Sequence, residues 1–128
     1  MSGYKFKLVL IGKSKVPRAL RGMDMSQLPV HYYAQKNAWM DQDICNDWFT
    51  NRLIPEIVNN FGNNVCMHLL LDNYTGHPPD LDDISPLVQV HYLPPNTTSI
   101  LQPMDQGIIL SLKTRVKSLY YKKIVTFT

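Results

Sequence analysis

Alternation of apolar and polar residues predicts strands in both halves of the chain. Tyr4 to Ile11 alternates before it becomes fully apolar, and the run stops at Gly12. A short extended piece is expected at Val30 to Tyr33, directly after a proline. Val65 to Leu71 is an almost continuous apolar run, which is typical of a strand buried on both faces of a parallel sheet. Val88 to Leu93 is the last strand candidate, and the crossover that precedes it is long enough for parallel pairing.

Apolar residues at helical spacing predict the elements that cover this sheet. The first helix should begin near Met40 or Asp41, with Asp41 as its N-cap. Pro55 should kink or break this helix near Leu53, because proline lacks the backbone N–H that an α-helix needs. A short helix is expected near Leu81 to Ile84, inside the crossover. The alternation of strands and helices along the chain predicts an α/β fold.

A final helix is expected from about Gln102 or Pro103 to Ile124. One side of it is mainly apolar and lies within roughly 60° of a single direction, so this side should face the sheet. The residues of that side are Asp105, Ile108, Ile109, Leu112, Val116, Leu119 and Tyr120. The Asp105 carboxylate is therefore expected to point inward, where a charge needs a partner, a metal or a water-filled cleft. Stabilisation by the helix dipole explains the same carboxylate without any function.

Composition narrows the class of protein. The chain has 128 residues, of which 45% are hydrophobic and 18% are charged, so we expect one globular domain over residues 1–128. Its apolar runs are far shorter than the roughly 20 residues that span a bilayer, and we expect no membrane partner. Cys45 and Cys66 both lie in apolar patterns, which favours buried thiols in a reducing compartment, although one disulfide is an alternative.

The net charge of +3 hides two basic ends and an acidic middle. Residues 1–23 carry only cationic side chains, residues 24–105 hold all ten acids, and residues 106–128 are again purely basic. This arrangement suits a carboxylate site beside a surface that binds a polyanion. From the charge alone, ordinary solvated faces are the preferred explanation, because a net charge of +3 is modest. The residues expected to contact nucleic acid are Lys13, Lys15, Arg18, Lys113, Arg115 and Lys117.

Two aspartates are the candidates for chemistry. Asp72 directly follows the apolar run that ends at Leu71, and ligands gather at the carboxyl ends of strands in α/β sheets. A simple turn at Asp72-Asn73 explains this residue without a function. Asp72 and Asp105 could instead share Mg²⁺, which accepts a few carboxylates and keeps other positions for water and phosphate oxygens. Two such ions can support phosphoryl transfer.

The segment between these aspartates carries the most specific pattern. Residues 91–107 read HYLPPNTTSILQPMDQG, which resembles the LPPNTTS-x-LQP-x-DQG signature of the DDE_1 family. This family comprises the Tigger and pogo transposases and host proteins derived from them, including jerky and centromere protein B. Upstream blocks resemble the family's LVIGKSK, AWM and LLLDN motifs in the same order, at Leu10 to Lys15, Ala38 to Met40 and Leu69 to Asn73. The resemblance covers residues 8–124, nearly the whole chain.

The resemblance implies an RNase H-like catalytic core in which three acidic residues and magnesium cut DNA and join strands. Asp72 matches the second acid and Asp105 the third, so both are expected to be catalytic residues and metal ligands. The first acid is expected on a strand before the LVIGKSK block, yet no acid precedes Asp24 here. We therefore expect a fragment of a nuclear transposase core that is inactive alone. The alternative is a non-enzymatic, transposase-derived module that binds nucleic acid or protein.

The implied topology has the strand order 3-2-1-4-5, and its first two strands lie outside this chain. Tyr4 to Ile11 corresponds to strand 3, Val65 to Leu71 to strand 4, and Val88 to Leu93 to strand 5. We expect an incomplete three-stranded core of marginal stability. Its open edge at strand 4 should also favour self-association.

One loop departs from the family pattern. Where the family has Ala or Cys followed by Pro-Ala, this chain has Tyr74-Thr75-Gly76, which is expected to re-aim the loop beside Asp72. His77 and Pro78 then match the family's His-Pro. For His77 a structural role is the preferred interpretation over one near the phosphate.

Overall fold

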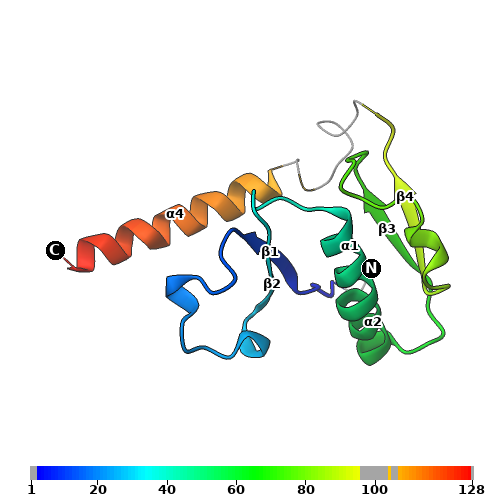
Figure 1. The fold of residues 1–128 in the computed structure, drawn as a ribbon, viewed down its shortest axis with the longest axis horizontal. Helices are drawn as coiled ribbons and strands as arrows, with labels where there is room; N and C mark the ends of the chain where they lie inside the picture. The colour runs from blue at the N-terminus through cyan, green and yellow to red at the C-terminus, as the bar shows by residue number, and fades with distance from the viewer. Residues whose placement is uncertain (1–2, 96–103, 105–106, 128) are drawn as a thin grey trace. The chain divides into compact units, whose positions relative to one another are not determined.

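The computed structural model describes residues 3–95, 104 and 107–127 of the chain. Its main elements are β1 (Leu8–Gly12), β2 (Val30–Ala34), α1 (Gln42–Trp48), α2 (Ile54–Phe61), β3 (Met67–Leu71), β4 (Val88–Tyr92) and α4 (Ile108–Phe127), drawn in Figure 1. The chain divides into two compact units, residues 1–68 with 74–89 and residues 69–73 with 90–128. No helix in the described ranges is long and apolar enough to cross a membrane. The mixture of strands and helices confirms the α/β class.

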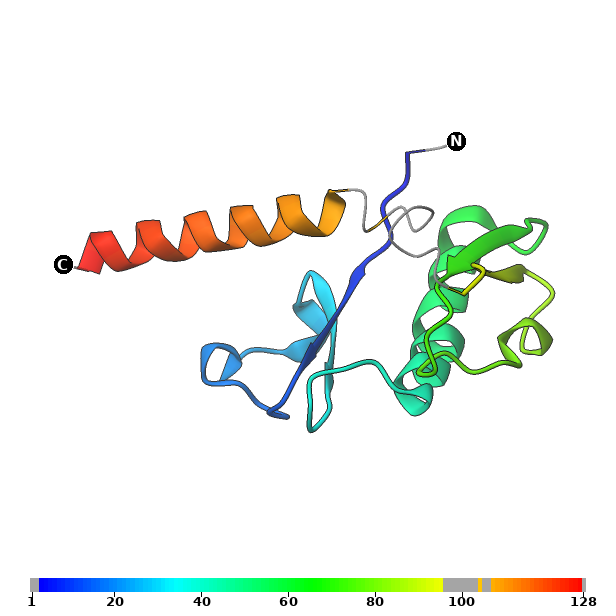
Figure 2. The ribbon, with the colours of Figure 1, turned by 90° about the horizontal axis from the view of Figure 1, so that it is seen from above.

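The strands β1 and β2 form a parallel pair, and they lie side by side in both views (Figure 1, Figure 2). The register joins Leu8 to Val30 and Gly12 to Ala34. The predicted extended piece at Val30 to Tyr33 is thus confirmed as a strand. The first strand begins at Leu8 instead of Tyr4.

The N-terminal residues pack on α2 instead of extending the strand. The Tyr4 ring meets Phe6 at 5.0 Å and Phe61 at 5.2 Å, in both cases edge to face. The Tyr4 hydroxyl also donates a hydrogen bond of 2.9 Å to the Glu56 carboxylate. These contacts occupy the side chains that the alternation had assigned to a longer strand.

The predicted three-stranded core is wrong for the described part of the chain. The strands there form two separate pairs, β1 with β2 and β3 with β4. The segment equated with strand 3 therefore does not pair with the Val65 to Leu71 segment. Its partner is β2 instead, which follows β1 after the connection formed by residues 13–29.

The helix after β2 changes its type in the middle, as the proline predicts. The Asp41 carboxylate accepts a 2.9 Å hydrogen bond from the Ile44 backbone N–H, which confirms Asp41 as the N-cap of α1. Residues Phe49–Leu53 form a π-helical turn between α1 and α2. In an α-helix the Pro55 ring would collide with the carbonyl four residues earlier, and the wider turn avoids this collision. Pro55 thus causes a local irregularity, and the helix continues past it.

The buried face of this helix keeps a constant spacing across the irregular turn. Cys45, Phe49, Leu53 and Ile57 are all buried, and they follow one another at intervals of four residues. In a regular α-helix this spacing drifts by about 40° at each step, because one turn takes 3.6 residues. The wider π turn offsets part of that drift. The stripe therefore stays on one side from α1 to α2.

The strands β3 and β4 are parallel, as predicted, but β3 is not buried on both faces. The Met67 backbone N–H donates a hydrogen bond to the Leu87 carbonyl at the start of both strands, and the Leu93 N–H donates one to the Leu71 carbonyl at their end, so the two strands run in the same direction. Successive residues of β3 alternate between half-buried and exposed, because neighbouring side chains of a strand point to opposite faces. A face of this two-stranded sheet is open, and the prediction of full burial is wrong. The strand also starts two residues later than predicted.

The two cysteines differ in burial. Cys45 is fully buried, whereas Cys66 lies before β3 and is exposed, so the expectation of two buried thiols is correct for Cys45 only. Both are free thiols, which rules out the disulfide alternative in this structure.

The apolar side of α4 is exposed, contrary to the prediction that it faces a sheet. Leu112, Val116 and Leu119 are 47%, 58% and 66% exposed. The unit that contains α4 holds only the ends of β3 and β4. A helix of this length spans about 30 Å, and strand ends of a few residues offer no face of comparable length.

Candidate functional site

Asp72 lies where the sequence placed it, directly after β3. The strand ends at Leu71, whose carbonyl accepts a 2.7 Å hydrogen bond from the Leu93 backbone N–H. This bond fixes the carboxyl end of β3 beside the end of β4. Asp72 itself is half-buried. A carboxylate at the carboxyl end of a parallel strand occupies the usual place for a reactive group in an α/β sheet.

Asp105 falls outside the described residues. The predicted pairing of Asp72 with Asp105 around Mg²⁺ therefore stays a prediction. Within residues 3–95, 104 and 107–127, no three side chains of the types His, Cys, Asp and Glu gather into a group that could hold a metal ion. Asp72 supplies one carboxylate of the expected set.

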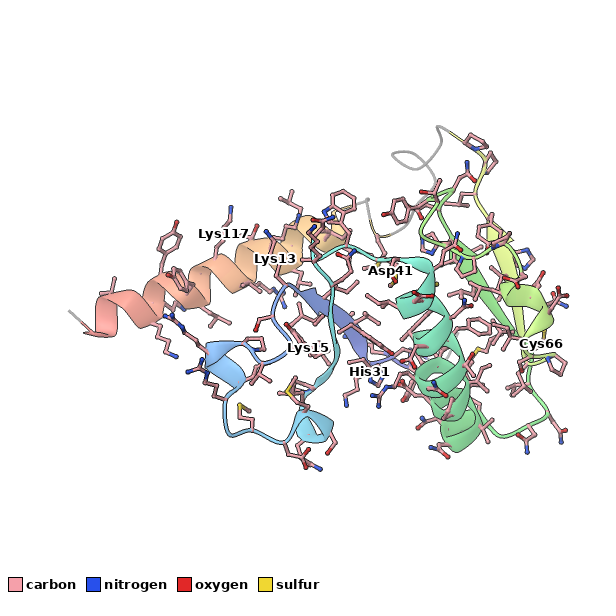
Figure 3. The ribbon with its side chains drawn as sticks, viewed as in Figure 1. Lys13, Lys15, His31, Asp41, Cys66 and Lys117 are labelled. Atoms are coloured by element: carbon pink, nitrogen blue, oxygen red, sulfur yellow. The ribbon has the colours of Figure 1, made fainter. Side chains whose placement is uncertain are left out.

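The predicted DNA-binding residues lie on two separate segments. Lys13, Lys15 and Arg18 are exposed on the loop that follows β1, where Figure 3 labels the two lysines. The Tyr32 hydroxyl donates a hydrogen bond to the Ser14 carbonyl, which holds this loop against β2. Contact with nucleic acid stays a prediction for this loop.

The second set of predicted DNA-binding residues lies on α4. Lys113, Arg115 and Lys117 are all exposed there. Each unit of the chain therefore carries one basic segment.

His77 makes contacts of a structural kind. Its Nδ1 lies 3.8 Å from Cys45 Sγ, and its ring meets the edge of the Tyr74 ring at 5.6 Å. Burial raises the pKa of the Cys45 thiol to about 11, so this thiol stays protonated at neutral pH and is no nucleophile. These contacts are consistent with the structural role preferred for His77.

A cavity of about 470 Å³ opens between two loops that the sequence does not place together. One loop joins β2 to α1 and contributes Trp39 and Asp41, and the other contributes Tyr74, Thr75 and Gly76. The Trp39 and Tyr74 rings lie 6.3 Å apart. Two signals in the sequence mark these loops, namely the Ala-Trp-Met block and the departure from the family pattern at Tyr74.

A second polar cluster surrounds His31 on β2, which Figure 3 labels. The Glu56 carboxylate accepts hydrogen bonds from the Tyr4 hydroxyl and, at 3.2 Å, from the Lys7 backbone N–H. His31 Nε2 lies 3.8 Å from this carboxylate, and this buried atom has no hydrogen-bond partner in the described structure. Burial lowers the pKa of His31, and the positive charges of Lys7 and Arg52 lower it further. The neutral imidazole is therefore favoured despite the nearby carboxylate.

This cluster predicts a pH dependence of stability. In the unfolded chain His31 should titrate near its ordinary pKa of about 6.5, whereas in the folded chain it titrates lower. The unfolded state then binds more protons, so the free energy of unfolding should decrease as pH falls from about 7 toward 5. The urea concentration at the midpoint of unfolding should decrease as the pH falls over this range. In His31→Gln the midpoint should change less steeply with pH. An unchanged slope in the variant, or an NMR titration of His31 at or above its ordinary value, would contradict the assignment.

Comparison with known proteins identifies a family that matches this chain. Residues 2–127 match the family described as DDE superfamily endonuclease. The chain is 34% identical over 119 residues to Tigger transposable element-derived protein 7 of Homo sapiens, covering 86% of this chain and 22% of that protein. It is 37% identical over 110 residues to the human Jerky protein homolog, covering 82% and 19%. It is 28% identical over 122 residues to Tigger transposable element-derived protein 4 of Mus musculus, covering 95% and 22%.

The similarity covers most of this chain but only part of each relative. The chain spans about a fifth of the length of these relatives. No solved structure matches it at a significant level. The family match nevertheless covers almost every residue, and it includes the strand end that carries Asp72. The chain therefore belongs to the DDE superfamily endonuclease family and is related to the Tigger and Jerky transposase-derived proteins.

Proposed function

We propose that this chain is part of an RNase H-like transposase core that acts on DNA with Mg²⁺. The position of Asp72 at the carboxyl end of β3 carries the proposal, because a strand end is a rigid place from which a carboxylate reaches a ligand. The family match surrounds this residue on both sides. Asp72 is the proposed second acid and Asp105 the proposed third.

The residue types fit a hard divalent cation. Carboxylate oxygens are ligands that Mg²⁺ accepts, and Asp72 would hold the ion together with Asp105. A bound Mg²⁺ stabilises the negative charge that develops on phosphate oxygens. The role of Asp72 is to present an oxygen from a fixed backbone position, which the hydrogen bond from Leu93 N to Leu71 O holds in place. With only two of the three acids in this chain, we propose that it does not cleave DNA alone.

The proposed partner is DNA, and the proposed location is the nucleus. The exposed lysine and arginine side chains of the loop after β1 and of α4 supply positive charge for phosphates. The basic segments carry no feature that reads base edges, so the proposed contact is weak and independent of sequence. The second candidate function is a non-enzymatic module that binds nucleic acid or protein. This alternative draws on the same exposed basic side chains and needs no metal site.

Binding of Mn²⁺, a paramagnetic substitute for Mg²⁺, distinguishes the two functions. If Asp72 is a metal ligand, Mn²⁺ should broaden the backbone amide signals of Asp72 and Asn73 in NMR spectra, and Asp72→Asn should abolish the effect. The matched control is Asp82→Asn, because Asp82 is an exposed carboxylate in the acidic turn Leu81–Asp83. This variant should leave the Asp72 signals sensitive to Mn²⁺. Broadening confined to that acidic turn would favour the non-enzymatic module.

A plasmid assay tests the predicted inactivity of the chain alone. Supercoiled DNA incubated with the chain and Mg²⁺ or Mn²⁺ should remain intact, because one acid of the expected three is missing. Nicking that disappears in Asp72→Ala would show that two acids suffice, and would overturn the inactivity while assigning Asp72 to catalysis. Nicking that persists in Asp72→Ala would count against the catalytic role of Asp72.

A further inference from the structure

The cavity between the two loops is held open by bonds that tie the loops together. The Tyr74 hydroxyl donates a 3.2 Å hydrogen bond to the Met40 carbonyl, and Gln42 Nε2 donates one of 3.1 Å to the Thr75 carbonyl. Both bonds cross from the segment before α1 to the segment after β3. The cavity of about 470 Å³ lies within the usual range of small-ligand sites, about 300–1,000 Å³. It is therefore a preformed, wide-open hollow with the volume of a small-ligand site.

Backbone geometry on both loops supports this preformed shape. Ala38, directly before Trp39, has a φ of 57°, in the left-handed region that non-glycine residues rarely adopt. A Cβ on Gly76 would come within 2.7 Å of the Met40 carbonyl oxygen, so only glycine allows this approach of the two backbones. Unfavourable conformations of this kind persist where the surrounding structure enforces them, and they cluster at ligand sites.

The cavity has an aromatic side chain at its wall, Trp39, that is not buried in the core. Trp39 is 64% exposed, although its ring lies only 6.3 Å from the Tyr74 ring at an angle of 41°. Tyr74 is held from two sides, by its bond to Met40 and by the edge contact with His77. One ring is thus fixed, and the indole beside it remains open for stacking by a planar ligand.

The polar groups of the cavity suit a neutral, planar ligand. Gln35 uses its Oε1 to accept from the backbone N–H groups of Asn37 and Trp39, at 2.6 and 3.3 Å. Its amide NH₂, together with the Oε1 of Gln42 and the amide of Asn37, supplies both donors and acceptors at the wall. The only charged residue among the lining residues is Asp41, and its negative charge disfavours a phosphate inside the cavity. A nucleobase has the flat face and the mixed hydrogen-bonding edge that these groups match.

A basic segment adjoins the cavity within the same unit. The Gln35 backbone N–H donates a 2.8 Å hydrogen bond to the Gly12 carbonyl. Lys13 is the next residue, so the exposed loop with Lys13 and Lys15 begins beside Gln35, which lines the cavity. Figure 3 labels both lysines. Positive charge therefore lies beside a cavity that itself holds no cationic side chain. Single-stranded nucleic acid requires such an arrangement, with phosphates on cations and bases on aromatic rings.

We propose that this cavity binds an unpaired base of single-stranded DNA, which stacks on Trp39 while the neighbouring phosphates contact Lys13 and Lys15. The inference rests on the proposed function for the nature of the polymer. It adds a preference for unpaired over paired strands, because a base inside a duplex has both faces covered by its neighbours and cannot reach the indole. Trp39 and Tyr74 are thereby assigned as binding residues.

Fluorescence of the full chain provides the test. The Trp48→Phe background leaves Trp39 as the only tryptophan, since the chain has two. A short oligothymidylate strand should quench this fluorescence, whereas a duplex hairpin with the same number of phosphates should not. Trp39→Ala should weaken binding of the single strand by roughly 5- to 150-fold, the loss expected for one stacked base, and leave duplex binding unchanged. Trp39→Phe should recover part of the loss.

The controls separate this inference from the proposed function. Tyr121→Ala removes an aromatic ring of similar exposure, 63%, outside the cavity, and it should not alter the preference for single strands. A thermal melt of Trp39→Ala should match that of the parent, because the indole is mostly exposed. If both DNA forms bind and Trp39→Ala weakens neither or both equally, the base-binding site is refuted and the proposed function stands. If neither form binds, DNA as a partner fails, and the base-binding site fails with it.

Discussion

Replacement of Phe49 by alanine is expected to lower the free energy of unfolding by about 3–5 kcal/mol. Phe49 is fully buried, in the π-helical turn that joins α1 to α2. The stripe Cys45, Leu53 and Ile57 lies on the same side of this helix, so the lost ring leaves a cavity in the middle of the buried face. Domains are typically stable by only about 5–15 kcal/mol, and the loss would be a large part of that total.

Urea denaturation followed by circular dichroism measures this effect. Thr50→Ala is the matched control, because Thr50 is the next residue of the same turn and is exposed, and it should change stability by less than about 0.5 kcal/mol. Phe49→Leu keeps most of the volume and should lose less than about 1.5 kcal/mol, which keeps the test informative if the alanine variant does not fold. Equal losses in Phe49→Ala and Thr50→Ala would show that Phe49 is not at the centre of the core.

DNA affinity is expected to fall on the order of 10³-fold between 50 and 200 mM salt if all six predicted basic residues contact phosphates. Three of them lie on the loop after β1 and three on α4, and all are exposed. Each contact releases a condensed counterion, so six contacts give a slope of about −5 in a plot of log affinity against log salt. A fall of this size corresponds to about 4 kcal/mol of binding free energy. Fluorescence anisotropy with a labelled duplex at several salt concentrations gives the slope.

Charge-neutral variants assign the slope to particular residues. The triple variant Lys13→Gln, Lys15→Gln and Arg18→Gln should reduce the slope by about 3, because three contacts are lost. Lys36→Gln removes one lysine outside the predicted set and should leave the slope unchanged. Salt-independent binding, or binding confined to a single DNA sequence, would contradict the phosphate contacts. If the triple variant leaves the salt slope unchanged, the phosphate contacts are made by residues other than Lys13, Lys15 and Arg18.

Local features of the fold were predictable from the sequence because their causes are local. The N-cap at Asp41 depends on one carboxylate and an N–H three residues later, and the irregular turn depends on Pro55. The parallel pair of β3 and β4 follows from two apolar runs and the connection between them. Asp72 was predicted at a strand end from the apolar run that stops just before it, and it lies there.

Features that depend on distant partners were not predictable in the same way. Alternation shows that Leu8–Gly12 is a strand, but the choice of β2 as its partner is a matter of backbone pairing that periodicity does not encode. The cavity of Trp39 and Tyr74 requires loops more than 30 residues apart in the sequence to be joined by backbone-directed bonds. The apolar side of α4 obeys the helical period, yet periodicity cannot state whether a covering surface is present.

The π-helical turn requires that the number of residues between Phe49 and Leu53 stays the same. Removal of one residue there would convert the turn to an α-helical one and rotate everything that follows by about 100°. Ile57 would then leave the buried side, and the Glu56 carboxylate would move away from Tyr4 and Lys7. Substitutions at exposed positions of this turn are tolerable, whereas insertions and deletions are not. Among variants of this gene, length changes should therefore gather in the loop between α2 and β3 and be absent from this turn.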